Sequence, residues 1–153
     1  MAASWGRANL GPGDEVLISR LEHHSNIVPW QLLASELGFT IKVIPVDERG
    51  VLDQAAYRDL IGERTRLVAV NHVSNALGTV NPVADMASLA HEHGALIMVD
   101  GAQAAPHQHR CPGARCRFLR LFRPQGLWAP GSGPSTVVRN CSRPCRPGRA
   151  VAR

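Results

Sequence analysis

Short apolar runs alternate with helix signals between residues 14 and 100, and this alternation constrains the fold more than any other feature of the sequence. Four runs are expected to form strands: Glu15–Ser19, Thr40–Pro45, Leu67–Val73 and Ala95–Val99. Apolar residues occupy both faces of these runs, which is typical of parallel strands buried between helices. The sequence therefore predicts an α/β fold with a mainly parallel sheet flanked by helices.

The segments between the runs carry signals for helix starts and stops. Ser25 or Asn26 is expected to cap the first helix, with Pro29 in its first turn and Gly38 at its end. Asp53 is expected to cap the second helix. These local signals support the alternating order of strands and helices.

Polar residues follow three of the four expected strands. In parallel sheets, ligands bind beyond the carboxyl ends of the strands, so these residues are candidates for a site. They are His23 and His24, Ser74 and Asn75, and Asp100 and Gln103.

Asp100 ends the last apolar run and is the most informative of these candidates. A buried carboxylate is costly unless it has a cationic partner. The one lysine of the chain, Lys42, lies on a different expected strand. A protonated ring nitrogen of a bound cofactor would suit the site, and the alternative is that Asp100 caps the next turn.

The other candidates also have two interpretations. His23 could stack on an aromatic ring or act as an acid or base, whereas a solvated or capping role suits His24 better. Asn75 could bind a ligand oxygen or serve the backbone of a turn. Gln103 could donate to a ring oxygen or face solvent.

The formal net charge of +5 conceals a break near residue 109. Residues 1–109 contain all 12 acidic residues, whereas residues 110–153 contain 10 arginines, no acid and all four cysteines. We therefore expect one domain over residues 1–109 and little native structure in residues 110–153. The spacing of the four cysteines lacks the Cys-x-x-Cys pairs of metal sites, so no metal is expected.

No apolar stretch is long enough to span a membrane, and the N-terminus lacks the apolar core of a signal peptide. We therefore expect a cytoplasmic protein without a membrane partner.

Several motifs together resemble the class V, fold-type I enzymes that depend on pyridoxal 5'-phosphate (PLP), and within them the SufS-type group of cysteine desulfurases and selenocysteine lyases. The resemblance runs from about Ser4 to His107, and the motifs keep the order and spacing of the family. They are Glu22-His-His-Ser-Asn-Ile-Val-Pro-Trp30, Asn71-His-Val-Ser-Asn75, Leu77-Gly-Thr79 and Val99-Asp-Gly-Ala-Gln103.

The resemblance implies that residues 1–109 are part of the large PLP-binding domain. It implies that His23 stacks on the PLP ring, that Asp100 pairs with the pyridine nitrogen, and that Asn75 and Gln103 lie near the phenolic oxygen of the ring. The implied activity removes sulfur from L-cysteine, or selenium from L-selenocysteine, and gives alanine. The implied partners are a sulfur-acceptor protein, for iron–sulfur cluster assembly, and a second subunit in a homodimer.

The chain departs from this family after residue 109. The Schiff-base lysine of a Ser-Gly-His-Lys motif and the persulfide cysteine are both absent, so we expect the chain to be catalytically inactive. One set of codons for Phe122–Gly126, TTC-CGG-CCA-CAA-GGC, reads Ser-Gly-His-Lys when shifted by one base. We therefore hypothesise that residues 110–153 are a frameshifted reading of a desulfurase gene.

Two other functions stay open at this point. The chain could derive from another class V enzyme, such as an aminotransferase. It could also be a non-catalytic α/β binding protein with a basic tail, but we expect no nucleic-acid partner because a shifted GC-rich frame also enriches arginine.

Overall fold

The computed structural model describes residues 2–104 and 118–120, and its centre is a parallel sheet. Neighbouring strands follow the order β2-β1-β3-β4-β5, and every pair is parallel. The strands are β1 (Glu15–Ser19), β2 (Thr40–Ile44), β3 (Thr65–Asn71), β4 (Leu96–Asp100) and β5 (Phe118–Arg120). The predicted fold class is confirmed.

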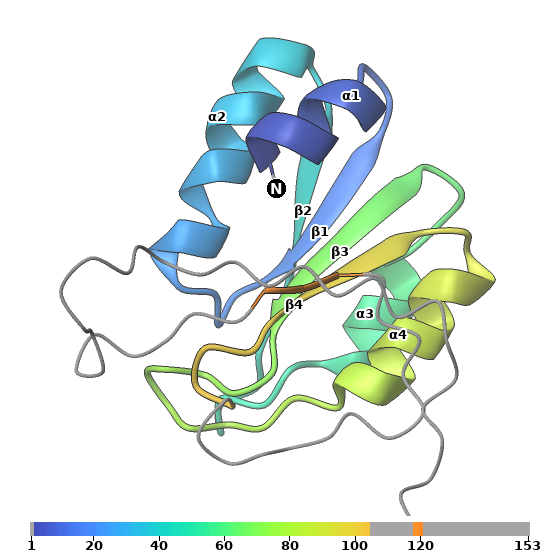
Figure 1. Cartoon of the computed structure of the whole chain (residues 1–153). Helices are drawn as coiled ribbons and strands as arrows, with labels where there is room; N and C mark the ends of the chain where they lie inside the picture. The colour runs from blue at the N-terminus through green and yellow to red at the C-terminus, as the bar shows by residue number, and fades with distance from the viewer. Residues whose placement is uncertain (1, 105–117, 121–153) are drawn as a thin grey trace, which may run out of the picture.

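Helices cover both faces of the sheet (Figure 1). On one face lie α1 (Arg7–Asn9), which follows a π-helical turn at Ala2–Gly6, and α2 (Val28–Leu37). On the other face lie α3 (Gln54–Leu60) and α4 (Val83–Glu92). None of the described helices is long and apolar enough to cross a membrane.

The strands divide their side chains between two apolar cores because successive residues of a strand point to opposite faces. On the α1/α2 face, Val16 and Leu67 pack with Trp30. On the α3/α4 face, Leu17 and Val68 belong to the core that contains Tyr57, whose hydroxyl donates to the Met86 carbonyl at 2.9 Å. This double burial explains why the strands are apolar on both faces.

Two of the predicted helix signals are confirmed. Asp53 Oδ1 accepts hydrogen bonds from the Ala55 and Ala56 amides at the start of α3. Gly38 ends α2 at a φ of 76°, a left-handed conformation that glycine adopts without a Cβ clash.

The predicted cap of the first helix is wrong. Neither Ser25 nor Asn26 caps α2, because both lie in a 3₁₀ turn at His24–Asn26 that precedes it. The Asn26 side chain instead bonds the buried carboxyl of Glu22 and accepts from Trp30 Nε1 at 3.4 Å. The Asn26 side chain is therefore used in side-chain bonds within its own turn and helix start, and not as a cap of the α2 amides.

One predicted strand is longer than the observed one. The third strand ends at Asn71 rather than Val73, because Val73 turns back to pair with Val80 in an isolated antiparallel bridge. In the segment where little native structure is expected, Phe118–Arg120 pairs with β4. The rest of the predicted tail lies outside the described residues.

Candidate functional site

The strand order places a topological switch point, called the crevice below, at the carboxyl ends of β1 and β3. β1 connects onward to β2 on one side and lies against β3 on the other, so the chain reverses its direction of travel across the sheet there. Ligands of α/β proteins bind at such switch points. The segments that carry the predicted site residues follow the ends of β1, β3 and β4 and therefore meet at this edge.

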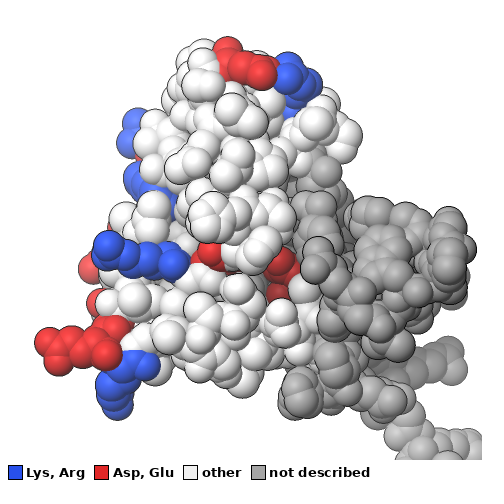
Figure 2. All heavy atoms as spheres, turned by 90° about the vertical axis from the view of Figure 1, so that its left-hand side faces the viewer, with Lys and Arg blue, Asp and Glu red and all other residues white. Residues whose placement is uncertain are grey.

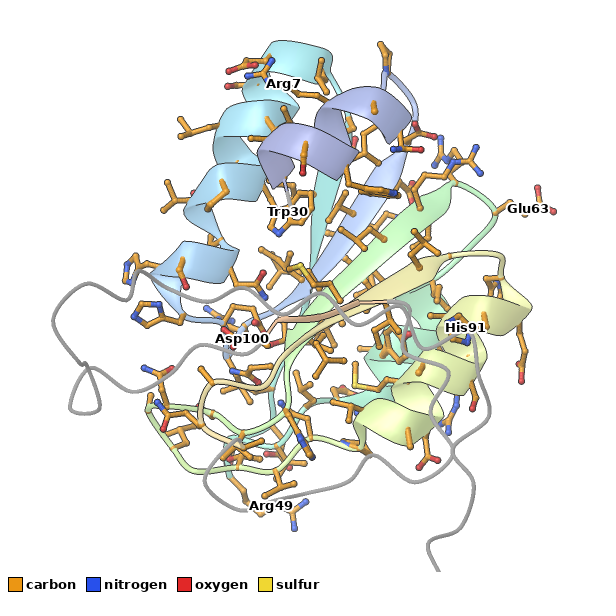
Figure 3. The ribbon with its side chains drawn as sticks, viewed as in Figure 1. Arg7, Trp30, Arg49, Glu63, His91 and Asp100 are labelled. Carbon is orange, nitrogen blue, oxygen red and sulfur yellow. The ribbon has the colours of Figure 1, made fainter. Side chains whose placement is uncertain are left out.

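Asp100 is the last residue of β4 and is 6% exposed (Figure 3). Its Oδ1 accepts from the Ala102 amide at 3.0 Å, and its carbonyl accepts from the His72 amide at 2.9 Å. The turn-capping contact predicted as an alternative is therefore present. It orients the carboxyl group at the edge of the sheet where a ligand would bind.

His23 is exposed and lies in the turn after β1. Its Nδ1 accepts from the Ser25 amide at 3.3 Å and caps the 3₁₀ turn. A neutral ring that accepts at Nδ1 carries its proton on Nε2, which is then the nitrogen that can donate to a ligand. His23, rather than His24, thus makes the capping contact, while the two rings meet edge to face at 6.1 Å.

Asn75 and Gln103 are both exposed, and they lie in the segments after β3 and β4. The neighbouring Ser74 is 2% exposed, and its Oγ accepts from the amides of Ala76 and Leu77. Ser74 therefore holds the turn, while Asn75 lies on its solvent side.

A buried polar cluster under this crevice was not predicted from the sequence. It consists of Ser19, Glu22, Asn26, Asn71 and Asn81. Glu22 accepts from Ser19 Oγ, from Asn26 Nδ2 at 2.6 Å and from the Asn71 amide at 2.8 Å. The available signal was Glu22 itself, an acidic residue between an apolar strand and an apolar helix.

Asn71 and Asn81 extend this cluster. Asn71 Nδ2 donates to the Leu21 carbonyl at 2.6 Å, and Asn81 Nδ2 donates to Asn71 Oδ1 at 2.6 Å. The cluster thereby joins the turn that carries His23 to the loop that carries Asn75.

The two carboxyl groups of this region influence each other. Burial raises the pKa of Glu22 to about 7, and the negative charge of Asp100 contributes to the increase. Two acidic groups under one crevice favour a cationic ligand group there, such as a protonated ring nitrogen. The residues present therefore fit the pyridine ring that the sequence resemblance implies.

The one lysine of the chain lies away from this edge. Lys42 Nζ is 2.7 Å from Glu15 Oε2, and Glu15 begins β1 at the opposite edge of the sheet. Lys42 also lines an open pocket there with Asp59 and Arg64. The structure thus agrees with the expectation that Lys42 is not part of the crevice.

Charges of both signs are interspersed on the described part of the α2 side of the molecule (Figure 2). Acidic atoms lie near the middle of that face, partly covered by uncharged neighbours. Within the described part of the chain, no three His, Cys, Asp or Glu side chains form a group that could hold a metal ion.

Comparisons with known proteins agree on one relationship. The sequence model of the aminotransferase class-V family matches residues 1–110. A probable cysteine desulfurase of Halalkalibacterium halodurans is 52% identical over 107 residues, which are 70% of this chain and 26% of the relative. The chain thus spans about a quarter of the length of this relative.

Solved structures give the same result. The cysteine desulfurase CsdA of Escherichia coli, in its S-sulfonic acid form, superposes with a TM-score of 0.74 at 33% identity, covering 79% of this chain and 31% of that one. A C-DES mutant with glycine covalently linked to its PLP cofactor has a TM-score of 0.64 at 25% identity, covering 74% of this chain and 31% of that one.

Proposed function

Because the chain belongs to the class-V aminotransferase family, we propose that it carries part of the PLP site of a cysteine desulfurase. The resemblance predicted from the sequence motifs is confirmed at the level of the family. Class V aminotransferases and cysteine desulfurases are PLP-dependent enzymes. The observation that carries the proposal is the buried carboxyl of Asp100 at the end of β4, beside the switch-point crevice.

Each site residue has one proposed task. The Asp100 carboxylate holds a proton on the pyridine nitrogen, which makes the bound ring a sink for electrons. The exposed His23 ring stacks on the cofactor, and its capped Nδ1 leaves the Nε2 proton for the ligand. Asn75 and Gln103 donate to the phenolic oxygen from the loops that follow β3 and β4.

The substrate and partners follow from the family. We propose L-cysteine or L-selenocysteine as substrate, a sulfur-acceptor protein, and a homodimer in the cytoplasm, without a nucleic-acid or membrane partner. The chain as written is inactive, because its only lysine is paired with Glu15 at the opposite edge of the sheet.

Binding of PLP to the full chain tests the cofactor proposal. Titration followed by fluorescence should show saturable binding, and Asp100→Asn should weaken it by about tenfold or more, since a charge-assisted hydrogen bond is lost. Asp59→Asn, an exposed change on α3, is the matched control and should bind as the parent does.

Pyridoxine 5'-phosphate serves as a second probe because it has no aldehyde to react with Lys42. Both probes should lose affinity in the Asp100 variant. The proposed site would be contradicted if the parent chain bound neither probe. It would also be contradicted if the Asp100 and Asp59 variants bound the probes equally well.

A further inference from the structure

We propose that Glu22 is a positioning residue of the crevice, whose carboxyl group ties the His23 turn to the end of β3. The inference rests on the proposed function only in treating His23 and Asp100 as cofactor-facing groups. The tie itself is a property of this chain and can be measured without a ligand.

Three hydrogen bonds to one carboxyl group join three separate segments. Glu22 Oε1 accepts from Ser19 Oγ at the end of β1 and from the Asn71 amide at the end of β3. Its Oε2 accepts from Asn26 Nδ2 in the 3₁₀ turn at 2.6 Å. Glu22 is 8% exposed, so water cannot readily replace these donors.

The tie lies between the two residues that are proposed to face the cofactor, His23 and Asp100. Glu22 directly precedes His23, and Asn71 is the register partner of Asp100 across β3 and β4. A bond from Glu22 to the Asn71 amide therefore sets the His23 turn against the strand beside Asp100. A second bond, from Asn71 Nδ2 to the Leu21 carbonyl, joins the same two segments, so loss of the Glu22 bond should loosen the turn rather than release it.

The hydrogen-bond donors favour the ionised carboxyl, while burial opposes ionisation more strongly and leaves the pKa of Glu22 raised. Two of its three donors are amide N–H groups, which cannot reverse to accept a proton from Glu22. No Lys or Arg among the described residues forms an ion pair with Glu22. Protonation therefore places an O–H donor on a carboxyl group that already accepts three hydrogen bonds. The bonds that join the His23 turn to β3 should then weaken.

Several titratable groups of the described residues lie on the elements around Glu22. Asp100 approaches from β4, and its charge helps to raise the pKa of Glu22 to about 7. His23 and His24 belong to the same turn, and His72 follows Asn71. A test must therefore separate any effect of these histidines from that of Glu22.

Nuclear magnetic resonance of the ¹⁵N-labelled full chain provides this test. The Asn71 amide donates directly to the carboxyl, so its resonance should shift between about pH 5.5 and 8.5 as Glu22 ionises. The shift should vanish in Glu22→Gln, which keeps the size of the side chain. It should persist in Glu48→Gln, a matched change at an exposed turn residue.

Amide exchange and PLP affinity report on positioning. In Glu22→Gln the Ser25 amide, which donates to His23 Nδ1, should exchange faster than in the parent chain. PLP affinity should fall by about threefold to tenfold, the loss expected for one misplaced hydrogen-bond partner. Glu22→Ala should have larger effects on both readouts, and Glu48→Gln should have none.

Each outcome decides the proposal. A pH-dependent Asn71 shift that survives in Glu22→Gln, or unchanged Ser25 exchange in that variant, overturns the tie even if Glu22→Ala fails to fold. Unchanged PLP affinity in Glu22→Gln overturns the positioning role. If the parent chain binds no PLP, the proposed function fails, while the Asn71 and Ser25 measurements still decide whether Glu22 ties the turn to β3.

Discussion

At the scale of single residues, the crevice depends on two buried carboxyl groups with different surroundings. Asp100 lies at a strand end and accepts from the amide of the turn that follows. Glu22 lies beneath the turn after β1 and, within residues 2–104, accepts from three neutral donors. The first group is placed to meet a ligand cation, whereas the second holds protein segments together and is costly to ionise.

This cost of ionisation gives a prediction for stability. Burial raises the pKa of Glu22 from 4.5 to about 7, so the folded state binds the proton more tightly than the unfolded state does. Burial of the neutral carboxyl thus stabilises the folded state fully below about pH 4.5, and this stabilisation is lost as the pH rises through about 7, a change of about 3 kcal/mol, because the cost of burying the charge exceeds what the hydrogen bonds of the ionised carboxyl return.

Glu22→Gln removes the titrating group and should remove this dependence. Urea unfolding at several pH values should show the stability of the parent chain, relative to Glu22→Gln, falling by about 3 kcal/mol from acid to weakly alkaline pH. The difference between the parent and the exposed control Glu48→Gln should stay flat. A parent–variant difference that is constant or grows with pH would show that Glu22 is not the buried acid described above.

At the scale of elements, helix ends show how local chemistry fixes a boundary. Asp53 Oδ1 accepts from two amides in the first turn of α3, at 2.9 and 3.0 Å. Asp53→Ala should therefore cost about 1 kcal/mol, the usual loss of an N-cap. Thermal or urea unfolding of the full chain measures it.

Asp59→Ala on the same helix is the control for this change. Asp59 lies near the C-terminus of α3, where a negative charge is unfavourable, so its removal should be neutral or slightly stabilising. Equal losses in the two variants would mean that helix propensity, and not the cap, determines the effect.

Local signals were sufficient for some elements and insufficient for others. Asp53 and Gly38 act within a few residues of themselves, and both were predicted correctly. The start of α2 was predicted incorrectly, because Asn26 bonds Glu22 and Trp30 instead of the helix amides. The end of β3 was missed because Val73 pairs with Val80, which a run of apolar residues does not reveal.

At the scale of the whole molecule, one part of the candidate site could be predicted from the sequence and another part could not. The strand order brings the His23, Asn75 and Asp100 segments to one edge, as the alternating pattern predicts. The polar cluster was not predictable, because Glu22 meets the Asn71 amide 49 positions further along the chain. Only the folded sheet brings these two residues together.

The whole sequence also contains the break near residue 109, where the acids end and the cysteines begin. The family model stops at nearly the same place, at residue 110. We propose that a change of reading frame underlies both observations, because it would leave the preceding motifs intact and replace the family sequence with arginine-rich translation. The hypothesis also accounts for the missing lysine without requiring an unrelated tail.

Resequencing the gene through codons 105–135 tests this hypothesis. The bases encoding Phe122–Gly126 should contain TCC-GGC-CAC-AAG, or synonymous codons for Ser-Gly-His-Lys, one base out of frame. Because codon degeneracy permits short chance matches, the shifted frame should also continue in family-like sequence on both sides. Codons 14–100 serve as the control and should encode family-like sequence only in the present frame.

If the shifted frame lacks the motif, the arginine-rich segment is a genuine part of the protein, and the absence of a lysine from its PLP site needs another explanation. If the motif is present, a chain expressed from the corrected frame should carry PLP on the lysine of that motif after borohydride reduction, whereas the present chain has no lysine there.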